Sequence, residues 1–142
     1  MSKGNTFEND LLRLIFNAVA IANIADNAVS APLTQLFVSL HTADPGETGT
    51  EATSEAAYGG YARVGVNRNT GGWVVTANSV SPAANIDFPA VTSGTGTLTH
   101  FAIGVASTGA TKVLYKGALT PTITIANGVI PRLTTATAIT ED

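Results

Sequence analysis

The chain has 142 residues, a formal net charge of −3, only 12% charged residues and no cysteine. This length is that of one ordinary domain with its own core, and the absence of cysteine excludes disulfides and thiolate metal sites. The few Lys and Arg residues are scattered, which argues against a nucleic-acid partner, because phosphate binding needs a clustered basic surface. A surface of low charge is suited to packing against another protein.

The first predicted element is a helix over residues 6–25. Asn5 or Thr6 is a suitable cap, and Glu8 stands three residues after Asn5, as in a capping box. Apolar residues then recur at helical spacing, and Asn27 and Pro32 follow as stop signals. The apolar run at 11–25 is too short and too polar to cross a bilayer, and acidic residues precede it where a signal peptide carries positive charge. We therefore expect neither a signal peptide nor a membrane contact.

The apolar surface of this helix is wider than one stripe. A helix that buries only one face would leave several of these side chains in water, and such a patch usually marks an interface. The sequence therefore predicts a partner contact, in addition to an intramolecular one, at Phe7, Leu11, Leu12, Phe16 and Ile24.

After Pro32 the pattern changes to that of strands. Thr, Val and Ile favour pleated strands, and Gly-containing turns separate the runs. The turn at residues 69–72 predicts a hairpin that pairs residues 61–68 with residues 73–77. The complete set of predicted strands is 36–42, 61–68, 73–77, 84–89, 97–106, 112–120, 122–126 and 133–139.

About eight short strands with turns between them predict a mainly β fold. The expected architecture is an antiparallel β sandwich of the jelly-roll kind with one N-terminal helix. A doubly wound parallel sheet is disfavoured, because strands and helices do not alternate. We expect a single folded unit, with residues 1–30 as the helix and arm and residues 31–142 as the β domain.

The polar stretch at residues 43–60 poses the main chemical question. It follows His41 and holds the acidic residues Asp44, Glu47, Glu51 and Glu55. Calcium is the functional interpretation of such an oxygen-rich loop, but the EF-hand spacing is absent and turn chemistry interrupts the run. We interpret it as an exposed, solvated loop without metal, and His41 as a core or hydrogen-bonded histidine.

The other combinations of residues that could form a catalytic site are weakly supported by the sequence. His100 and Asp87 could be drawn into a serine hydrolase arrangement, but the sequence has no nucleophile elbow. Glu47 and Glu55 could form a glycosidase pair, but flexible loops hold such geometry poorly. Phosphate-binding glycine motifs are absent. We therefore expect no catalytic residue, no cofactor and no enzyme activity. Trp73 is either a core residue or an exposed binding anchor, with the core favoured.

Several stretches carry a resemblance to a known family. They are "LFVSLHTADPGETGTEATSEAAYGGYARVGVNR", "GGWVVTANSVSPAANIDFPAVTSGTGTLTHFAIG", the ending "ATAITED" and the N-terminal "FENDLLRLIFNAVAIANIADN". Together they resemble a family of small structural proteins of tailed bacteriophages, over most of the chain. Members are often labelled tail-fibre-like, and a close relative is a capsid cement protein with a jelly-roll fold.

This resemblance implies a virion structural protein made in the host cytoplasm and carried on the exterior of the capsid. Its expected partners are the major capsid protein and other copies of itself, as a dimer or trimer. It would stabilise the shell by bridging capsid subunits. The alternative is a tail or tail-fibre component that binds a host receptor or glycan, for which Trp73, Tyr58 and Tyr61 would be the aromatic candidates.

Overall fold

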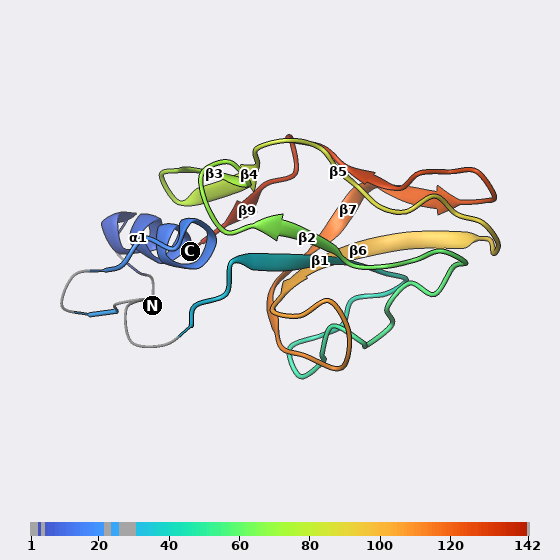
Figure 1. Ribbon diagram of the computed structural model, residues 1–142, viewed down its shortest axis with the longest axis horizontal. Coiled ribbons are helices and arrows are strands. Elements are labelled where there is room, and N and C mark those ends of the chain that lie inside the picture. The colour runs from blue at the N-terminus through green and yellow to red at the C-terminus, as the bar shows by residue number, and fades with distance from the viewer. Residues whose placement is uncertain (1–2, 4, 22–23, 26–30, 142) are drawn as a thin grey trace. The chain divides into compact units, whose positions relative to one another are not determined.

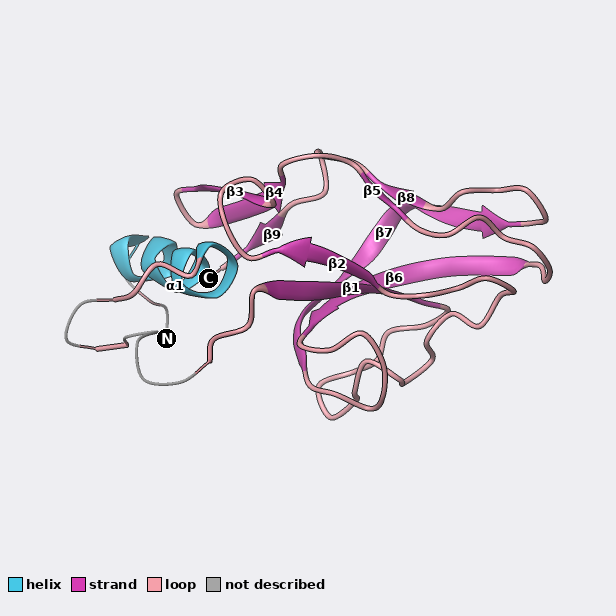
Figure 2. Ribbon diagram, viewed as in Figure 1, coloured by secondary structure: helices cyan, strands magenta, loops and turns pink. Residues whose placement is uncertain are grey.

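Strands make up most of the regular structure (Figures 1 and 2). The computed structural model describes residues 3, 5–21, 24–25 and 31–141. Within these residues α1 (Asn5–Asn17) is the one α-helix, and the pairs β1–β6, β6–β7, β3–β4 and β4–β9 are antiparallel. The prediction of a mainly β, antiparallel fold with an N-terminal helix is therefore confirmed. The jelly-roll topology is consistent with this arrangement and stays a prediction.

The strands form three small sheets. The strand orders are β2-β1-β6-β7, β3-β4-β9 and β5-β8. The strands in the described residues are β1 (Gln35–His41), β2 (Val64–Asn67), β3 (Trp73–Thr76), β4 (Ser79–Pro82), β5 (Ile86–Asp87), β6 (Gly96–Gly104), β7 (Val113–Ile125), β8 (Arg132–Leu133) and β9 (Ile139–Thr140).

The chain divides into two compact units, and each is assembled from separate stretches of sequence. Unit 1 comprises Met1–Gln35, Val66–Asn85 and Leu133–Asp142, and unit 2 comprises Leu36–Gly65 and Ile86–Arg132. The helix is therefore grouped with two later stretches of the chain, whereas the sequence led us to expect a division at residues 30 and 31.

The core of unit 1 is the contact between α1 and the sheet β3-β4-β9. Leu12, Phe16 and Trp73 are almost completely buried, and the rings of Phe16 and Trp73 meet edge to face with their centroids 4.8 Å apart. The amide of Asn17 donates a hydrogen bond to the backbone carbonyl of Trp73 at 3.1 Å. Trp73 is thus a core residue, as the sequence favoured.

The helix ends earlier than the sequence predicted. We expected it to reach residue 25, but α1 ends at Asn17, and Ala18 takes a left-handed conformation with φ 56°. The guanidinium of Arg68 donates to the backbone carbonyls of Leu14 and Ile15, two groups that the amides of a further turn would otherwise occupy. The expected helical residues 22–23 lie outside the described residues.

The predicted hairpin between residues 61–68 and 73–77 is wrong in its pairing. The turn itself is present, because the amides of Gly72 and Trp73 donate to the carbonyl of Asn69 at 3.0 Å. However, β2 lies next to β1, and β3 pairs with β4, a strand that the sequence analysis missed. The β3–β4 hairpin turns at residues 77–78 with Ala77 at φ 52°. No glycine marks this turn, so its sequence carried no hairpin signal.

Unit 2 is built on the antiparallel run β1–β6–β7. The inward-facing residues Val38, Leu40, Leu98 and Ile103 are fully buried or nearly so. The two strands predicted at 112–120 and 122–126 are one strand, β7, with an irregularity opposite residues 98–100. None of the described residues form a helix that is long and apolar enough to span a membrane.

Candidate functional site

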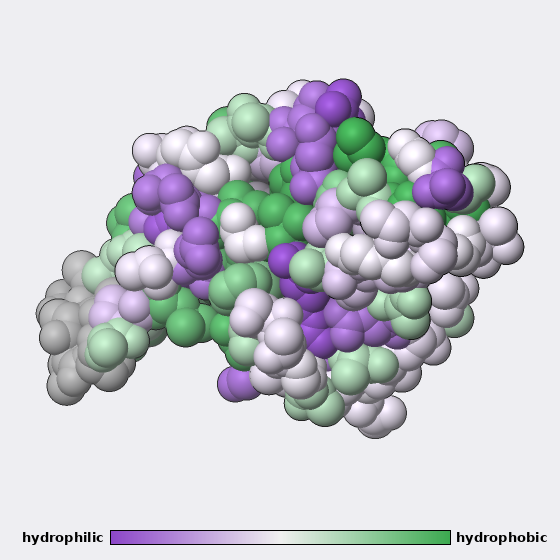
Figure 3. Space-filling model, turned by 45° about the vertical axis from the view of Figure 1, so that its right-hand side comes forward, coloured by the Kyte–Doolittle hydropathy of each residue, from purple (hydrophilic) through white to green (hydrophobic). Residues whose placement is uncertain are grey.

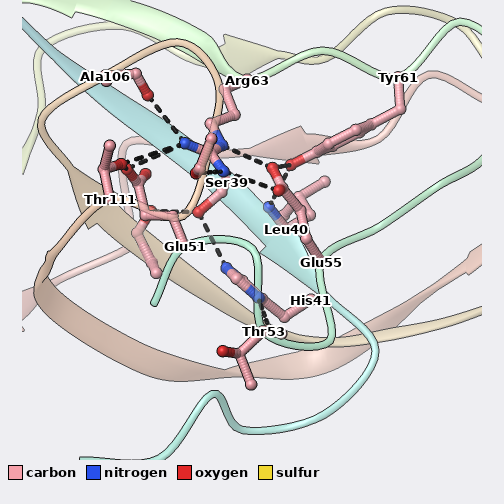
Figure 4. A network of polar contacts seen from close by, with 12 residues as sticks. Ser39, Leu40, His41, Glu51, Thr53, Glu55, Tyr61, Arg63, Ala106 and Thr111 are labelled. Carbon is pink, nitrogen blue, oxygen red and sulfur yellow. Dashed lines mark hydrogen bonds and ion pairs between the residues drawn. The ribbon is translucent and has the colours of Figure 1, made fainter. Parts of the chain in front are cut away.

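The most elaborate polar arrangement in unit 2 is a buried cluster around Arg63 (Figure 4). Arg63 lies one residue before β2, and its side chain is 2% exposed. Its Nε donates to Glu55 Oε1 at 2.6 Å and its Nη2 to Glu55 Oε2 at 2.8 Å, which is a bidentate pair. Its Nη1 donates to Glu51 Oε2 at 3.1 Å. The carboxylate of Glu51 is completely buried.

The same guanidinium also holds the loop between β6 and β7. Nη1 donates to the carbonyl of Ala106 at 3.0 Å, and Nη2 donates to the carbonyl of Gly109 at 2.8 Å. Thr111 completes the cluster, because its hydroxyl donates to Glu51 Oε2. One side chain therefore fastens two loops that are far apart in sequence to each other.

Local structure brings the two acids to this point. In a turn, the amide of Thr53 donates a hydrogen bond to the carbonyl of Thr50 at 2.9 Å. The amide of Glu51 donates to the carbonyl of Thr111 at 2.9 Å. Glu55 follows as an isolated bridge partner of His41. The turn residues that we interpreted as solvated therefore direct two of their carboxylates inward.

The predicted exposed loop at 43–60 thus needs correction. Its beginning is exposed, with the Glu47 side chain 91% exposed and paired with Lys116. Glu51, Ala56 and Tyr58 are buried. The partner of these acids was not predicted, because Arg63 is separated from them by a glycine turn and lies within the predicted strand 61–68. In a chain with so few charges, an arginine inside a predicted strand was the available signal.

Burial and pairing shift the pKa values of these groups in opposite directions. Burial raises the pKa of Glu51, and the hydroxyl of Thr111 and the charge of Arg63 oppose that rise. The hydrogen bonds to Glu55 raise the pKa of Arg63, so the cation is firmly retained. Burial also raises the pKa of Tyr61, whose hydroxyl donates to Glu55 Oε1 at 3.0 Å. The cluster is a network of charge-assisted hydrogen bonds that stabilises loop structure.

A glycine makes room for the cluster. A Cβ placed on Gly104, near the end of β6, would lie 1.9 Å from Cδ of Glu51. We expect Gly104→Ala to lower the free energy of unfolding by about 1–3 kcal/mol or more, because the buried carboxylate must leave its position on Arg63. Urea unfolding measures the effect. Gly71→Ala is the control, since its Cβ would meet only the side chain of Asn69 at 3.2 Å; equal effects of the two changes would contradict the prediction.

His41 belongs to a second buried contact beside this cluster. It is completely buried, its Nε2 lies 2.9 Å from Oγ of Ser39, and its Nδ1 lies 2.9 Å from the carbonyl of Thr53. Since a carbonyl only accepts, Nδ1 carries the proton and Nε2 accepts from the serine hydroxyl. The expectation of a hydrogen-bonded core histidine is confirmed. Ser39 is buried as well, so this serine–histidine pair has no surface through which a substrate could reach it.

The buried position of His41 predicts a loss of stability in acid. Burial lowers the pKa of His41 below its ordinary value of 6.5. Below that value the unfolded chain takes up a proton that folded His41 does not, so stability falls with falling pH until the folded pKa is passed. The slope contributed by His41 should approach about 1.4 kcal/mol per pH unit. His41→Gln keeps a donor and an acceptor, and it should flatten this dependence in urea titrations between about pH 7 and about pH 5. Parallel losses in both proteins would contradict the prediction.

The structure does not bring the other predicted chemical residues together. Glu47 pairs with Lys116, whereas Glu55 pairs with Arg63, so they do not share a glycosidase-like site. His100 contacts the hydroxyl of Thr99, and Asp87 forms an exposed pair with Arg132. In the part of the chain that the structure describes, no three His, Asp or Glu side chains are grouped to hold a metal ion.

The aromatic candidates for a receptor site are largely buried. Trp73 is 1% exposed and Tyr58 is 6% exposed. The rings of Tyr58 and Tyr61 meet edge to face, with centroids 5.2 Å apart, and the hydroxyl of Tyr61 is held by Glu55. These side chains stabilise the β scaffold, and they do not present an open stacking surface.

The predicted partner-contact residues are divided between core and surface. Leu12 and Phe16 are completely buried within unit 1, and Leu11 is half-buried. Phe7 is 39% exposed and Ile24 is 74% exposed. Phe7 and Ile24 thus remain available to a partner, while Leu12 and Phe16 hold the helix on its own sheet. The partner contact itself stays a prediction.

These observations define a small, mainly β protein whose most developed polar cluster supports its own loops. Comparison with protein families identifies it further. A family model described as "Podophage GP4 fiber I protein gp80" matches residues 2–140, and the chain belongs to that family. It is accordingly a structural protein of a bacteriophage virion. Comparison with curated proteins gives no match.

Proposed function

We propose that this protein is a subunit of a podophage fibre and acts by assembly, without catalysis. The observation that carries the proposal is the match of the fibre-protein family over residues 2–140. A fibre subunit needs a scaffold that keeps its shape outside the cell, and the Arg63 cluster supplies such rigidity, because it fastens two loops through six hydrogen bonds of one side chain. This proposal favours the tail-fibre alternative over the capsid cement role that the resemblance first implied.

Capsid cement is the second candidate. It is favoured by the resemblance of residues 36–68 and 71–104 to a family that includes such a protein. In that role the chain would lie on the exterior of the capsid, contact the major capsid protein and bridge neighbouring subunits. Repeated weak contacts on a lattice would then add up through avidity.

The location of the protein in the virion separates the two candidates. Gold-labelled antibody against the purified chain, viewed on intact particles, should mark the fibres, and quantitation should give a few copies per virion. Labelling spread over the head, with a copy number that matches the capsid lattice, would overturn the fibre proposal and favour cement. Particles that lack the protein provide the control: in the cement case they should release DNA at a lower temperature, and in the fibre case at an unchanged temperature.

A surface on unit 1 would serve attachment in either role. Phe7 is exposed near the start of α1, and Leu12 on the same helix is buried. We expect Phe7→Ser to reduce incorporation into particles while the melting temperature stays near that of the unchanged protein. The matched variant Leu12→Ser should instead lower the melting temperature, because it puts a hydroxyl into the core. Normal incorporation of Phe7→Ser would argue against a contact at this position.

A further inference from the structure

Two long stretches of unit 2 carry no formal charge. Residues 88–111 and residues 117–131 contain no Asp, Glu, Lys or Arg. They include all of β6, most of β7 and the turns at the end of this strand pair where β6 begins and β7 ends. Because β6 and β7 pair with one another, the two uncharged stretches lie next to each other and form one uncharged region.

Pairing brings the exposed parts of the two stretches together. Thr97 is opposite Thr124 in the β6–β7 register, and the amide of Gly128 donates to the carbonyl of Val91 at 2.8 Å. We call residues 92–97, 120–124 and 126–130 the tip surface. Its exposed members are Thr92, Ser93, Gly94, Thr95, Gly96, Thr97, Thr120, Pro121, Thr122, Thr124, Ala126, Asn127, Gly128 and Ile130.

The chemistry of the tip surface restricts what it could bind. It has no cation for phosphate or for an acidic sugar and no anion for a metal or a basic peptide. It also has no aromatic side chain on which a sugar ring or a base could stack. It offers hydroxyl groups, each both donor and acceptor, and small side chains that allow close approach. Figure 3 shows a broad near-white area on the side of the molecule that comes forward, the colour of residues of intermediate hydropathy.

These properties fit an identical surface best. Like charges that face one another across a contact between copies cost several kcal/mol, and the tip surface has none to place there. Ile130 is 55% exposed and supplies apolar area that a contact would bury. A self-complementary contact uses the same patch on both copies, so each hydroxyl can meet a donor or an acceptor of the other copy.

The edge position of β7 points the same way and also limits the geometry. β7 is at the edge of the sheet β2-β1-β6-β7. Charged side chains usually protect an edge strand from pairing with another chain. In β7 the last charged residue is Lys116, and residues 117–125 carry no charge. Pro121 and the irregularity opposite residues 98–100 interrupt the outer half of the strand. The contact should therefore use side chains and turns, and it should not extend the sheet.

We propose that the tip surface is a self-association surface, on which a second copy of this chain packs its own tip surface. The proposal goes beyond the proposed function, since copies could associate in this way in a fibre or on a capsid. It assigns the expected contact between copies to a defined part of unit 2 and leaves the exposed residues of unit 1 to other virion proteins.

The test is the mass of the purified full chain in solution, measured by light scattering over a dilution series. The unchanged protein should exceed the monomer mass of 14.4 kDa and approach it on dilution. Thr95→Glu and Thr124→Glu place a charge in the tip surface and should weaken association by about tenfold or more. Thr108→Glu is the matched control, because Thr108 is exposed in unit 2 outside the tip surface, and it should associate normally.

A mixing experiment makes the test specific. Thr124→Glu and Thr124→Lys should each be monomeric under conditions where the unchanged chain associates, and a mixture of the two should associate again. Circular dichroism of each variant checks that the fold is retained. A monomeric unchanged chain, normal association of both Glu variants, or a mixture that stays monomeric would each overturn the proposal. None of these results bears on the location of the protein in the virion, so failure here is distinct from failure of the fibre proposal.

Discussion

Replacing Arg63 with alanine should lower the free energy of unfolding by about 3–5 kcal/mol, which is a large part of the stability of a domain of this size. The reason is that Glu51 has no exposed surface and would be left as an uncompensated buried carboxylate. The loop between β6 and β7, which Arg63 holds through Ala106 and Gly109, would also lose its anchor. Urea unfolding followed by circular dichroism measures the change.

Two variants sharpen this prediction. Arg132→Ala removes an arginine whose pair with Asp87 is about half exposed on both sides, and its effect should be small beside that of Arg63→Ala, because solvent screens such pairs. Arg63→Lys keeps the charge but not the fork of donors, so it should remain clearly destabilising. If Arg63→Ala proved as mild as Arg132→Ala, the cluster would not have the structural importance that we assign to it.

Replacing Trp73 with alanine should lower the free energy of unfolding by about 3–5 kcal/mol and loosen α1 from its sheet. Trp73 is 1% exposed and packs edge to face against Phe16, so its removal leaves a cavity under the helix. Hydrogen exchange should show faster exchange of the α1 amides. Val74→Ala is the matched control on the same strand, since Val74 is 47% exposed, and it should cost less than about 1 kcal/mol. Slow exchange of α1 in Trp73→Ala would contradict the assignment of Trp73 as the helix anchor.

The sequence predicted what depends on local periodicity. The change from helical to strand spacing near Pro32 and the Gly-containing turns gave the mainly β class and the approximate positions of β1, β3, β6 and β7. The end of α1 was not predictable, because the cation that occupies its last carbonyls, Arg68, is some fifty residues away in the chain. The pairing of β3 with β4 was hidden for a different reason: its turn uses Ala77 at a positive φ, where a glycine would normally announce it.

The candidate site was only partly visible in the sequence. Spacing identified Glu51 and Glu55 as notable, and the absence of ligand patterns argued against a metal. What turned the acids inward is a long-range contact with Arg63 and the space left by Gly104. Neither is a property of the loop itself. Burial in a polar loop is therefore decided by partners that a single sequence does not place in space.

The order in which the chain visits its two units has a mechanical consequence. Lys3 and Glu141 both belong to unit 1 and form an ion pair at 2.8 Å, and the chain leaves unit 1 for unit 2 and returns twice in between. A pulling force applied at the two ends would therefore act first on unit 1, through the short pairing of β9 with β4. Unit 2, with its Arg63 cluster, would carry no tension until unit 1 had opened.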